Sequence, residues 1–247
     1  MCRHLAYLGP PTTLEALLLA PEHSLLTQSY AAKEMVSGCI NADGFGVGWY
    51  DFAARADPAR YRRAVPMWHD RSFASMAGLV TSGAVVAAVR NATPGLPVEE
   101  SGNAPFTTGP WLFSLNGYVK DFRADAGVEL RSLLSPARLA GIEGASDGEV
   151  LFALALDHLD QGVPAGDALA AVVSTVQKVS GGRLNLLLGD GRTVAATTVG
   201  NTLYARQEDG MVTVASEPTD ASDRWTPVPD GSLVHGDAAG LRVEALA

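Results

Sequence analysis

The second residue of the chain, Cys2, carries two reactive groups if Met1 is removed. Initiator methionine is generally trimmed when the next residue is as small as cysteine, and the exposed cysteine then has both a thiol and a free α-amine. The thiolate is the attacking species, and an α-amine with a pKa of roughly 7.7–8.0 accepts a proton near neutrality. Cys2 therefore predicts a nucleophile with its base in the same residue. The alternative interpretation is a small residue at the start of a strand.

Two motifs further along the chain could hold a polar substrate. Arg90 follows an apolar run, and its planar guanidinium can bind a carboxylate through two parallel hydrogen bonds. Asn116 and Gly117 end another apolar run, where an amide side chain and an accessible glycine N–H suit an oxyanion hole. A surface arginine and an ordinary Asn-Gly turn are the structural alternatives.

A fourth motif, Ser146-Asp147-Gly148-Glu149, immediately precedes an apolar helical pattern. It predicts a capping box in which Ser146 is the N-cap residue and Glu149 lies at N3. The structural and functional interpretations are compatible here, because the cap could direct Asp147 toward a substrate ammonium.

Strand and helix patterns alternate without a linker or repeat, which predicts one domain over residues 1–247. Helices are expected at Thr12–Ala20 and around the apolar stripes Phe152–Leu159 and Leu169–Val176. Two sheets with helices on their outer faces are expected. The expected strands are Arg3–Gly9, Phe45–Tyr50, Ala84–Val89, Trp111–Leu115, Leu184–Leu188 and Thr193–Thr198, the last two joined by a hairpin at Gly189–Arg192.

Composition excludes several functional classes. A formal net charge of −9 offers no basic surface for nucleic acid, and we interpret the cluster of Arg60, Arg62 and Arg63 as a solvated stretch. Two cysteines are too few for a disulfide framework, which favours a reducing cytoplasm, and Cys39 is expected in the core. No apolar run approaches the ~20 residues of a membrane span, and no signal peptide is visible. No membrane partner is therefore expected.

Six motifs, in order over residues 2–150, resemble the glutaminase domain of class II glutamine amidotransferases. They are Cys2, Asp43-Gly44-Phe45-Gly46, Arg90-x-Ala92-Thr93-x-Gly95, Asn103-Ala104-Pro105-Phe106, Asn116-Gly117 and Ser146-Asp147-x-Glu149. A later segment, Ala215-Ser216-Glu217-Pro218, is similar to a strand of that family. Asn91 and Pro94 depart from the usual arginine motif, and the histidines usual in two other motifs are absent.

The resemblance implies both a fold and a set of roles. The implied fold is α+β, a four-layer αββα sandwich of the N-terminal-nucleophile (Ntn) hydrolase type. Cys2 becomes the nucleophile, and Asn116 with Gly117 donates to the oxyanion. Arg90 and Thr93 hold the glutamyl α-carboxylate, and Asp147 binds its α-ammonium.

The chain ends about 100 residues after Asp147, which leaves room to complete one sandwich but not a synthase domain. Its start, Met1-Cys2-Arg3-His4-Leu5-Ala6-Tyr7-Leu8-Gly9, resembles the stand-alone branch of the family. That branch implies a hydrolase that cleaves the γ-glutamyl amide of a small molecule. Two alternatives stay open: a glutaminase subunit that supplies ammonia to a separate synthase, and a non-catalytic domain that binds γ-glutamyl metabolites.

No cofactor or metal is expected, because the histidines and cysteines have no zinc-ligand spacing. Leaving-group specificity belongs to loops and is not encoded in a motif. A trimethylated histidine on the leaving side would favour aromatic side chains there, because a ring face attracts a quaternary ammonium. The candidates for such an aromatic wall are Trp49, Tyr50, Trp68 and Trp225.

Overall fold

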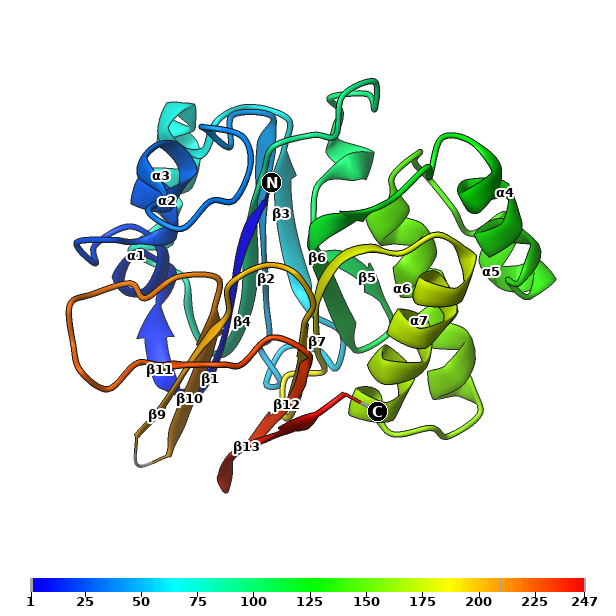
Figure 1. Ribbon diagram of the computed structural model, residues 1–247. Helices are drawn as coiled ribbons and strands as arrows, with labels where there is room; N and C mark the ends of the chain where they lie inside the picture. Colours follow the sequence, from blue (N-terminus) through cyan, green and yellow to red (C-terminus); the bar gives the residue numbers. More distant parts are fainter. Residues whose placement is uncertain (1, 209, 247) are drawn as a thin grey trace.

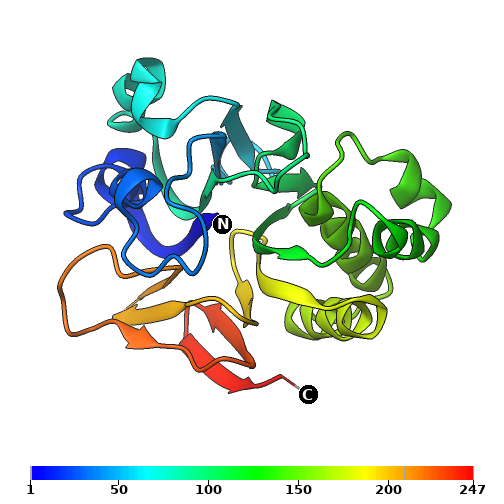
Figure 2. The ribbon, with the colours of Figure 1, turned by 45° about the horizontal axis from the view of Figure 1, so that its top comes forward.

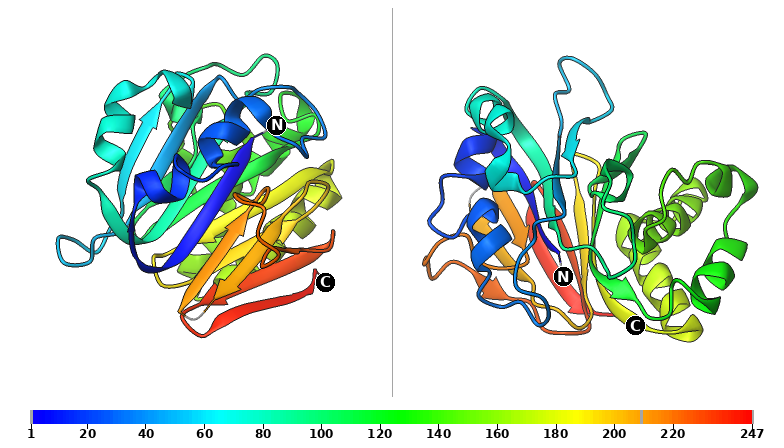
Figure 3. Two further views of the ribbon diagram at one scale, coloured as in Figure 1. Left: turned by 90° about the vertical axis from the view of Figure 1, so that its left-hand side faces the viewer. Right: turned by 90° about the horizontal axis from the view of Figure 1, so that it is seen from above.

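A computed structural model describes residues 2–208 and 210–246. The expected removal of Met1 concerns a residue outside this range. Two antiparallel sheets pack face to face, and helices cover both outer faces (Figure 1). The view from above in Figure 3 shows the same four layers. The α+β, four-layer αββα sandwich expected from the sequence is therefore confirmed.

In the described part of the chain, the first sheet has seven strands in the order β11-β9-β10-β1-β4-β2-β3. Its central strands, β1 and β4, pair antiparallel from Arg3↔Val89 onward. Both form because apolar residues pack on both of their faces. The bounds are β1 Arg3–Thr13, β2 Gly44–Trp49, β3 Ala59–Arg63, β4 Thr81–Arg90, β9 Tyr204–Glu208, β10 Met211–Ala215 and β11 Thr226–Pro227.

The second sheet has six strands in the order β13-β12-β8-β7-β6-β5 within the same described ranges. The hairpin between β7 and β8 is the one that the sequence predicts, since Gly191 has φ +83° and Asp190 Oδ1 accepts the N–H of Thr193 at 2.7 Å. The bounds are β5 Phe106–Thr108, β6 Trp111–Val119, β7 Gly182–Gly189, β8 Val194–Thr198, β12 Ser232–Asp237 and β13 Gly240–Ala245.

Helices on the two outer faces come from different parts of the chain. The helices α1, α2 and α3 cover the first sheet, whereas α4, α5, α6 and α7 lie on the side of the second (Figure 1). The bounds are α1 Leu14–Leu18, α2 Leu25–Ala31, α3 Arg71–Ala77, α4 Asp125–Ser132, α5 Pro136–Ala140, α6 Asp147–Asp160 and α7 Ala165–Val179, with 3-10 turns η1 at Met67–His69 and η2 at Glu100–Gly102.

Three apolar layers separate these elements. The inter-sheet layer contains Ala6 and Val86 from the first sheet and Leu112 and Leu187 from the second. Each sheet also buries its opposite face against its own helices. Strand ends border the inter-sheet layer. The start of β1 lies at this border, between the two halves of the molecule (Figure 2).

Three sequence expectations about local structure are wrong. The strand expected to end before Asn116 continues to Val119, because Asn116 pairs with Asn185 of β7 and this pairing overrides the turn preference of Asn-Gly. Cys39 is exposed rather than in the core, since it lies in the irregular segment between α2 and β2. Arg62, expected in a solvated stretch, lies in β3 and donates from Nη1 to Asn103 O at 3.3 Å.

Helix boundaries also differ from the pattern. The strand β1 extends to Thr13, and α1 spans only five residues rather than the expected Thr12–Ala20. The Thr13 side chain is the reason for the late start, because its Oγ1 accepts the N–H of Ala16 at 3.2 Å as an N-cap. The two amphipathic helices are confirmed as α6 and α7.

Candidate active site

Cys2 lies at the wall of a cavity beside the start of β1. It is half-buried, and its Sγ is 4.0 Å from the carbonyl oxygen of Asn91. The cavity is bounded by the end of β4, the middle of β6 and the first turn of α6, so it draws on both sheets and one helix N-terminus. Of the predicted site residues, those that line it are Cys2, Arg90, Thr93, Gly117 and Asp147.

Arg90 presents a buried guanidinium to this cavity. It is only 7% exposed, and its Nη2 donates to the Pro97 carbonyl at 3.1 Å. Its Nη1 has no hydrogen-bond partner among the described residues, which also hold no carboxylate within ion-pair distance of it. A Cβ at Gly102 would lie 2.7 Å from Nη2, so glycine is needed for the guanidinium to pack there. A buried cation with an unused donor suits a substrate carboxylate.

The carboxylate of Asp43 fixes the segment beside Arg90. Its Oδ2 accepts the N–H of Ala92 at 2.8 Å, and its own N–H donates to the Arg90 carbonyl at 3.0 Å. Sequence reasoning noted only the glycine spacing of the Asp43-Gly44-Phe45-Gly46 motif and missed this aspartate. The signal that could have found it is an aspartate directly before a strand, where a carboxylate commonly accepts backbone N–H groups.

Asp147 lies at the first position of α6 with its carboxylate buried, 7% exposed. Its Oδ2 accepts the N–H of Val119 at 2.9 Å and its Oδ1 that of Gly148 at 2.9 Å. Burial raises the pKa of Asp147, and these backbone hydrogen bonds together with the charge of Arg90 oppose the rise. The side chain is thus held in one place on the cavity wall, where it could accept hydrogen bonds from an ammonium.

Only one of the two hydrogen bonds of the predicted capping box forms. Ser146 Oγ accepts the N–H of Glu149 at 3.3 Å, as expected. The carboxylate of Glu149 instead accepts the N–H groups of Glu143 at 2.6 Å and Gly144 at 2.8 Å, so it anchors the preceding loop rather than the N-cap residue. Both contacts fix the helix start that presents Asp147.

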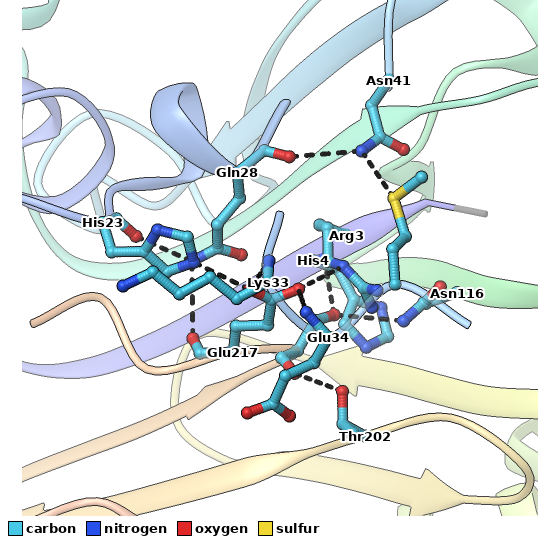
Figure 4. A network of polar contacts seen from close by, with 12 residues as sticks. Arg3, His4, His23, Gln28, Lys33, Glu34, Asn41, Asn116, Thr202 and Glu217 are labelled. Atoms are coloured by element: carbon cyan, nitrogen blue, oxygen red, sulfur yellow. Dashed lines mark hydrogen bonds and ion pairs between the residues drawn. The ribbon is translucent and has the colours of Figure 1, made fainter. Parts of the chain in front are cut away.

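The predicted oxyanion donors occupy two different places. Gly117 lines the cavity, and a Cβ there would lie 1.8 Å from the Arg183 carbonyl oxygen, so only glycine fits this register. The Asn116 side chain is fully buried and lies near Arg3 of β1 (Figure 4), with its Nδ2 3.2 Å from the Oγ of Ser216, which follows β10. Their role as oxyanion donors stays a prediction, with Gly117 as the member that faces the cavity.

The Cys2 thiol would need a base to act as the predicted nucleophile. Burial raises the pKa of the Cys2 thiol, although the Asn91 contact and the charge of Arg90 oppose this rise. His4, the adjacent histidine, does not line the cavity and is fully buried, with its Nδ1 3.2 Å from Ser114 Oγ. Burial, with a smaller effect of Arg3, lowers the pKa of His4 to about 3. His4 is therefore neutral and a weak base at neutral pH.

The buried neutral His4 predicts a loss of stability in acid. Its folded-state pKa lies below the unfolded value, so the unfolded chain binds the extra proton as the pH falls, and stability decreases. Between pH 6.5 and pH 5 we expect a loss of about 2 kcal/mol from this group. In urea unfolding at both pH values, His4→Gln should lose about that much less than the native chain. Equal losses in the two proteins would remove His4 as the cause.

The four aromatic candidates for the leaving-group side lie elsewhere. None of Trp49, Tyr50, Trp68 and Trp225 lines the cavity; Phe106 is the aromatic residue in its described lining. Trp225 and Tyr50 pack in the cores, and Trp68 contacts Tyr30 with ring centroids 5.8 Å apart. The predicted aromatic wall is therefore not formed around Cys2.

Within residues 2–208 and 210–246, no group of three or more His, Cys, Asp and Glu side chains is arranged to hold a metal ion. No helix in those ranges is both long and apolar enough to cross a bilayer.

Arg90→Lys tests the guanidinium that faces the cavity. An ammonium is a point charge and cannot reproduce two parallel hydrogen bonds to a carboxylate. We expect kcat/KM to fall about 10- to 100-fold, mainly through KM, for a γ-glutamyl substrate. Arg138→Lys, at a more exposed ion pair with Asp157 and Asp160, is the control and should change neither parameter. Unaltered kcat/KM in Arg90→Lys would remove Arg90 from the site.

An αββα sandwich with a cysteine immediately before β1 is the arrangement of the Ntn-type fold, although a fold alone does not establish an activity. A family model described as class II glutamine amidotransferases matches residues 22–208, and the chain belongs to this family. The chain is 40% identical over 247 residues to the gamma-glutamyl-hercynylcysteine sulfoxide hydrolase of Mycobacterium tuberculosis, covering 100% of this chain and 97% of that protein. It is also 40% identical over 235 residues to the protein of the same name from Mycolicibacterium smegmatis, with 95% of each covered.

Solved structures show the same fold. A glutamine aminotransferase class-II domain protein from Silicibacter pomeroyi superposes with a TM-score of 0.70 at 27% identity, covering 100% of both chains. The glutamine phosphoribosylpyrophosphate amidotransferase of B. subtilis gives a TM-score of 0.69 at 16% identity, with 100% of this chain and 49% of that one covered. The second likeness concerns the fold alone.

Proposed function

We propose that this protein hydrolyses the γ-glutamyl amide bond of γ-glutamyl-hercynylcysteine sulfoxide, giving glutamate and hercynylcysteine sulfoxide, a step of ergothioneine biosynthesis. The observation that carries the proposal is the cavity that joins the Cys2 thiol, the Arg90 guanidinium, whose Nη1 has no hydrogen-bond partner among the described residues, and the carboxylate of Asp147. A glutamyl group carries an α-carboxylate and an α-ammonium, which complement these two charges, and a γ-carbonyl for the thiol. The full-length likeness to the mycobacterial hydrolases supports the same substrate.

The mechanism assigns each group one role. Arg90 and Thr93 hold the α-carboxylate, and Asp147 holds the α-ammonium, so that the γ-carbonyl lies at Cys2. The Cys2 α-amine takes the thiol proton, and the thiolate adds to the carbonyl carbon. Gly117 donates its N–H to the oxyanion, whereas Asn116, the other predicted donor, does not line the cavity. The leaving amine receives the proton from the α-ammonium, and the C–N bond breaks to give a γ-glutamyl thioester.

Water completes the cycle. The α-amine, now neutral again, removes a proton from a water molecule that attacks the thioester carbonyl. The thioester C–S bond breaks, glutamate leaves and the thiol regains its proton. Each step uses groups of Cys2 and its neighbours and needs no redox partner.

The test compares two substrates on one preparation whose first residue is Cys2. Glutamate release is measured from γ-glutamyl-hercynylcysteine sulfoxide and from L-glutamine, at equal concentrations. We expect kcat/KM at least about 100-fold higher for the sulfoxide, since contacts to the leaving side add binding that glutamine lacks. Equal or higher turnover of glutamine would contradict the proposal.

The second candidate is a glutaminase subunit that supplies ammonia to a separate synthase, supported by the family membership. It predicts glutamine hydrolysis that a partner protein increases. A cytoplasmic location, one domain over residues 1–247 and the absence of nucleic-acid and membrane partners remain predictions from the sequence.

A further inference from the structure

The residue after the nucleophile, Arg3, has one of the largest completely buried side chains in the described part of the protein. The pairing Leu5↔Ala215 between β1 and β10, continued by two residues, sets Arg3 opposite Glu217. Arg3 Nε lies 3.0 Å from Glu217 Oε1, and both side chains are almost inaccessible, at 0% and 1% exposure. The pair therefore joins the start of β1 to the segment after β10 in a medium of low dielectric.

Glu217 is the centre of this network (Figure 4). Its Oε2 is 2.7 Å from His23 Nε2 and accepts the N–H of Lys33 at 2.8 Å. Its Oε1 accepts the N–H of Glu34 at 3.0 Å in addition to its contact with Arg3. Both oxygens of the buried Glu217 carboxylate thus have polar partners, and Arg3 is joined to it as an ion pair.

A hydrogen bond from Arg3 also determines which way the Asn116 amide is oriented. In the orientation drawn in Figure 4, Nδ2 is 3.2 Å from Ser216 Oγ, and the amide oxygen lies on the side of acceptors. Exchange of the oxygen and nitrogen satisfies every neighbour: Nδ2 donates to Cys2 O at 2.6 Å, and Oδ1 accepts from Arg3 Nη1 and Ser216 Oγ, each at 3.2 Å. The guanidinium has only donors, so it requires the amide oxygen to face it.

This amide orientation affects how Cys2 is held in place. The ladder between β1 and β4 begins at Arg3↔Val89, so Cys2 lies beyond the paired part of the strand. A residue at a chain terminus is held poorly unless other contacts fix it. In the exchanged orientation the Asn116 amide donates to the Cys2 carbonyl and accepts from Arg3, and Arg3 in turn pairs with Glu217.

We propose that Arg3, held by Glu217, is a positioning residue that fixes Cys2 through the Asn116 amide. It touches neither the cavity nor the reacting atoms and acts through the chain Glu217, Arg3, Asn116 and the Cys2 carbonyl. The proposal rests on the proposed function in one respect: Cys2 is the nucleophile whose position matters.

The test variant is Arg3→Lys, which keeps the charge but loses the planar group that spans Glu217 and Asn116. Kinetics are measured together with alkylation of Cys2 by iodoacetamide as a function of pH, read by peptide mass spectrometry because Cys39 is a second free thiol. Arg90 and Asp147 are the charged side chains that act on Cys2 from β4 and α6, and both stay unchanged. The control is Arg206→Lys, at an ion pair with Asp220 elsewhere in the first sheet.

We expect kcat to fall about 10- to 100-fold with KM within about threefold, since a displacement of about 1 Å at the reacting atom has an effect of this order. Alkylation of Cys2 should become faster at neutral pH, because a loosened thiol reaches water and loses the burial that raises its pKa. Ser216→Ala removes a hydroxyl that contacts the Asn116 amide and also accepts the His4 N–H at 3.0 Å, and it leaves Arg3 in place. It should give smaller changes in the same direction, and it replaces Arg3→Lys if that protein does not fold.

A folded Arg3→Lys, or failing that Ser216→Ala, with the native kcat and the native alkylation profile would overturn the proposal and leave Arg3 a purely stabilising residue. The alkylation profile does not depend on any substrate. A protein that hydrolyses no γ-glutamyl compound, yet shows the expected alkylation change, would contradict the proposed function and leave the positioning role of Arg3 intact.

Discussion

Replacing Cys2 with alanine is expected to abolish turnover and to leave substrate binding nearly intact. The change removes the only sulfur on the described cavity wall, whereas Arg90, Thr93 and Asp147 still hold the glutamyl end. A loss of at least about 10⁴-fold in kcat is expected, as for other enzymes that lose their nucleophile. Calorimetry with γ-glutamyl-hercynylcysteine sulfoxide should give a Kd within a few-fold of the native KM, with no heat of reaction.

The matched control for this change is the other cysteine. Cys39→Ser removes an exposed thiol that does not line the cavity, and it should retain native kcat and KM. Loss of activity in Cys39→Ser with retention in Cys2→Ala would reverse the assignment. Loss of both binding and turnover in Cys2→Ala, with an unchanged melting temperature, would indicate that the thiol contributes mainly to binding.

The sandwich could be predicted from the sequence because its central elements have strong local patterns. The strand β4 is a continuous apolar run, and α6 has an apolar stripe and a capping serine. Arg90 is the last residue of β4 and Asp147 is the first residue of α6, so their positions follow from these elements. That the two residues share one site was implied by the resemblance to class II glutamine amidotransferases and not by these local patterns.

Other features could not be predicted because they depend on contacts between distant parts of the chain. Arg3 and Glu217 are 214 positions apart, and no local pattern indicates that an arginine in an apolar strand is buried against a glutamate. The placement of Asn116 inside β6 depends on pairing with β7, which outweighs the local preference for a turn. The exposure of Cys39 depends on a segment without regular structure.

A residue retained before Cys2 is expected to suppress turnover even though the thiol is present. An acylated α-nitrogen is an amide and cannot accept the thiol proton, and burial already raises the pKa of the Cys2 thiol. The neighbouring His4 cannot take over, because its pKa is lowered to about 3. General-base assistance of this kind contributes about 10²- to 10⁴-fold, so a loss of that size in kcat is expected.

The decisive measurement uses one preparation before and after cleavage. A tag is placed so that a site-specific protease removes it together with Met1 and leaves Cys2 as the first residue, and mass spectrometry confirms both forms. Glutamate release from γ-glutamyl-hercynylcysteine sulfoxide is then measured for each form, with the melting temperature as the control for folding. We expect at least about a 100-fold rise in kcat on cleavage at an unchanged melting temperature. Equal kcat values for the two forms would show that the α-amine is not the base and would contradict the N-terminal-nucleophile mechanism.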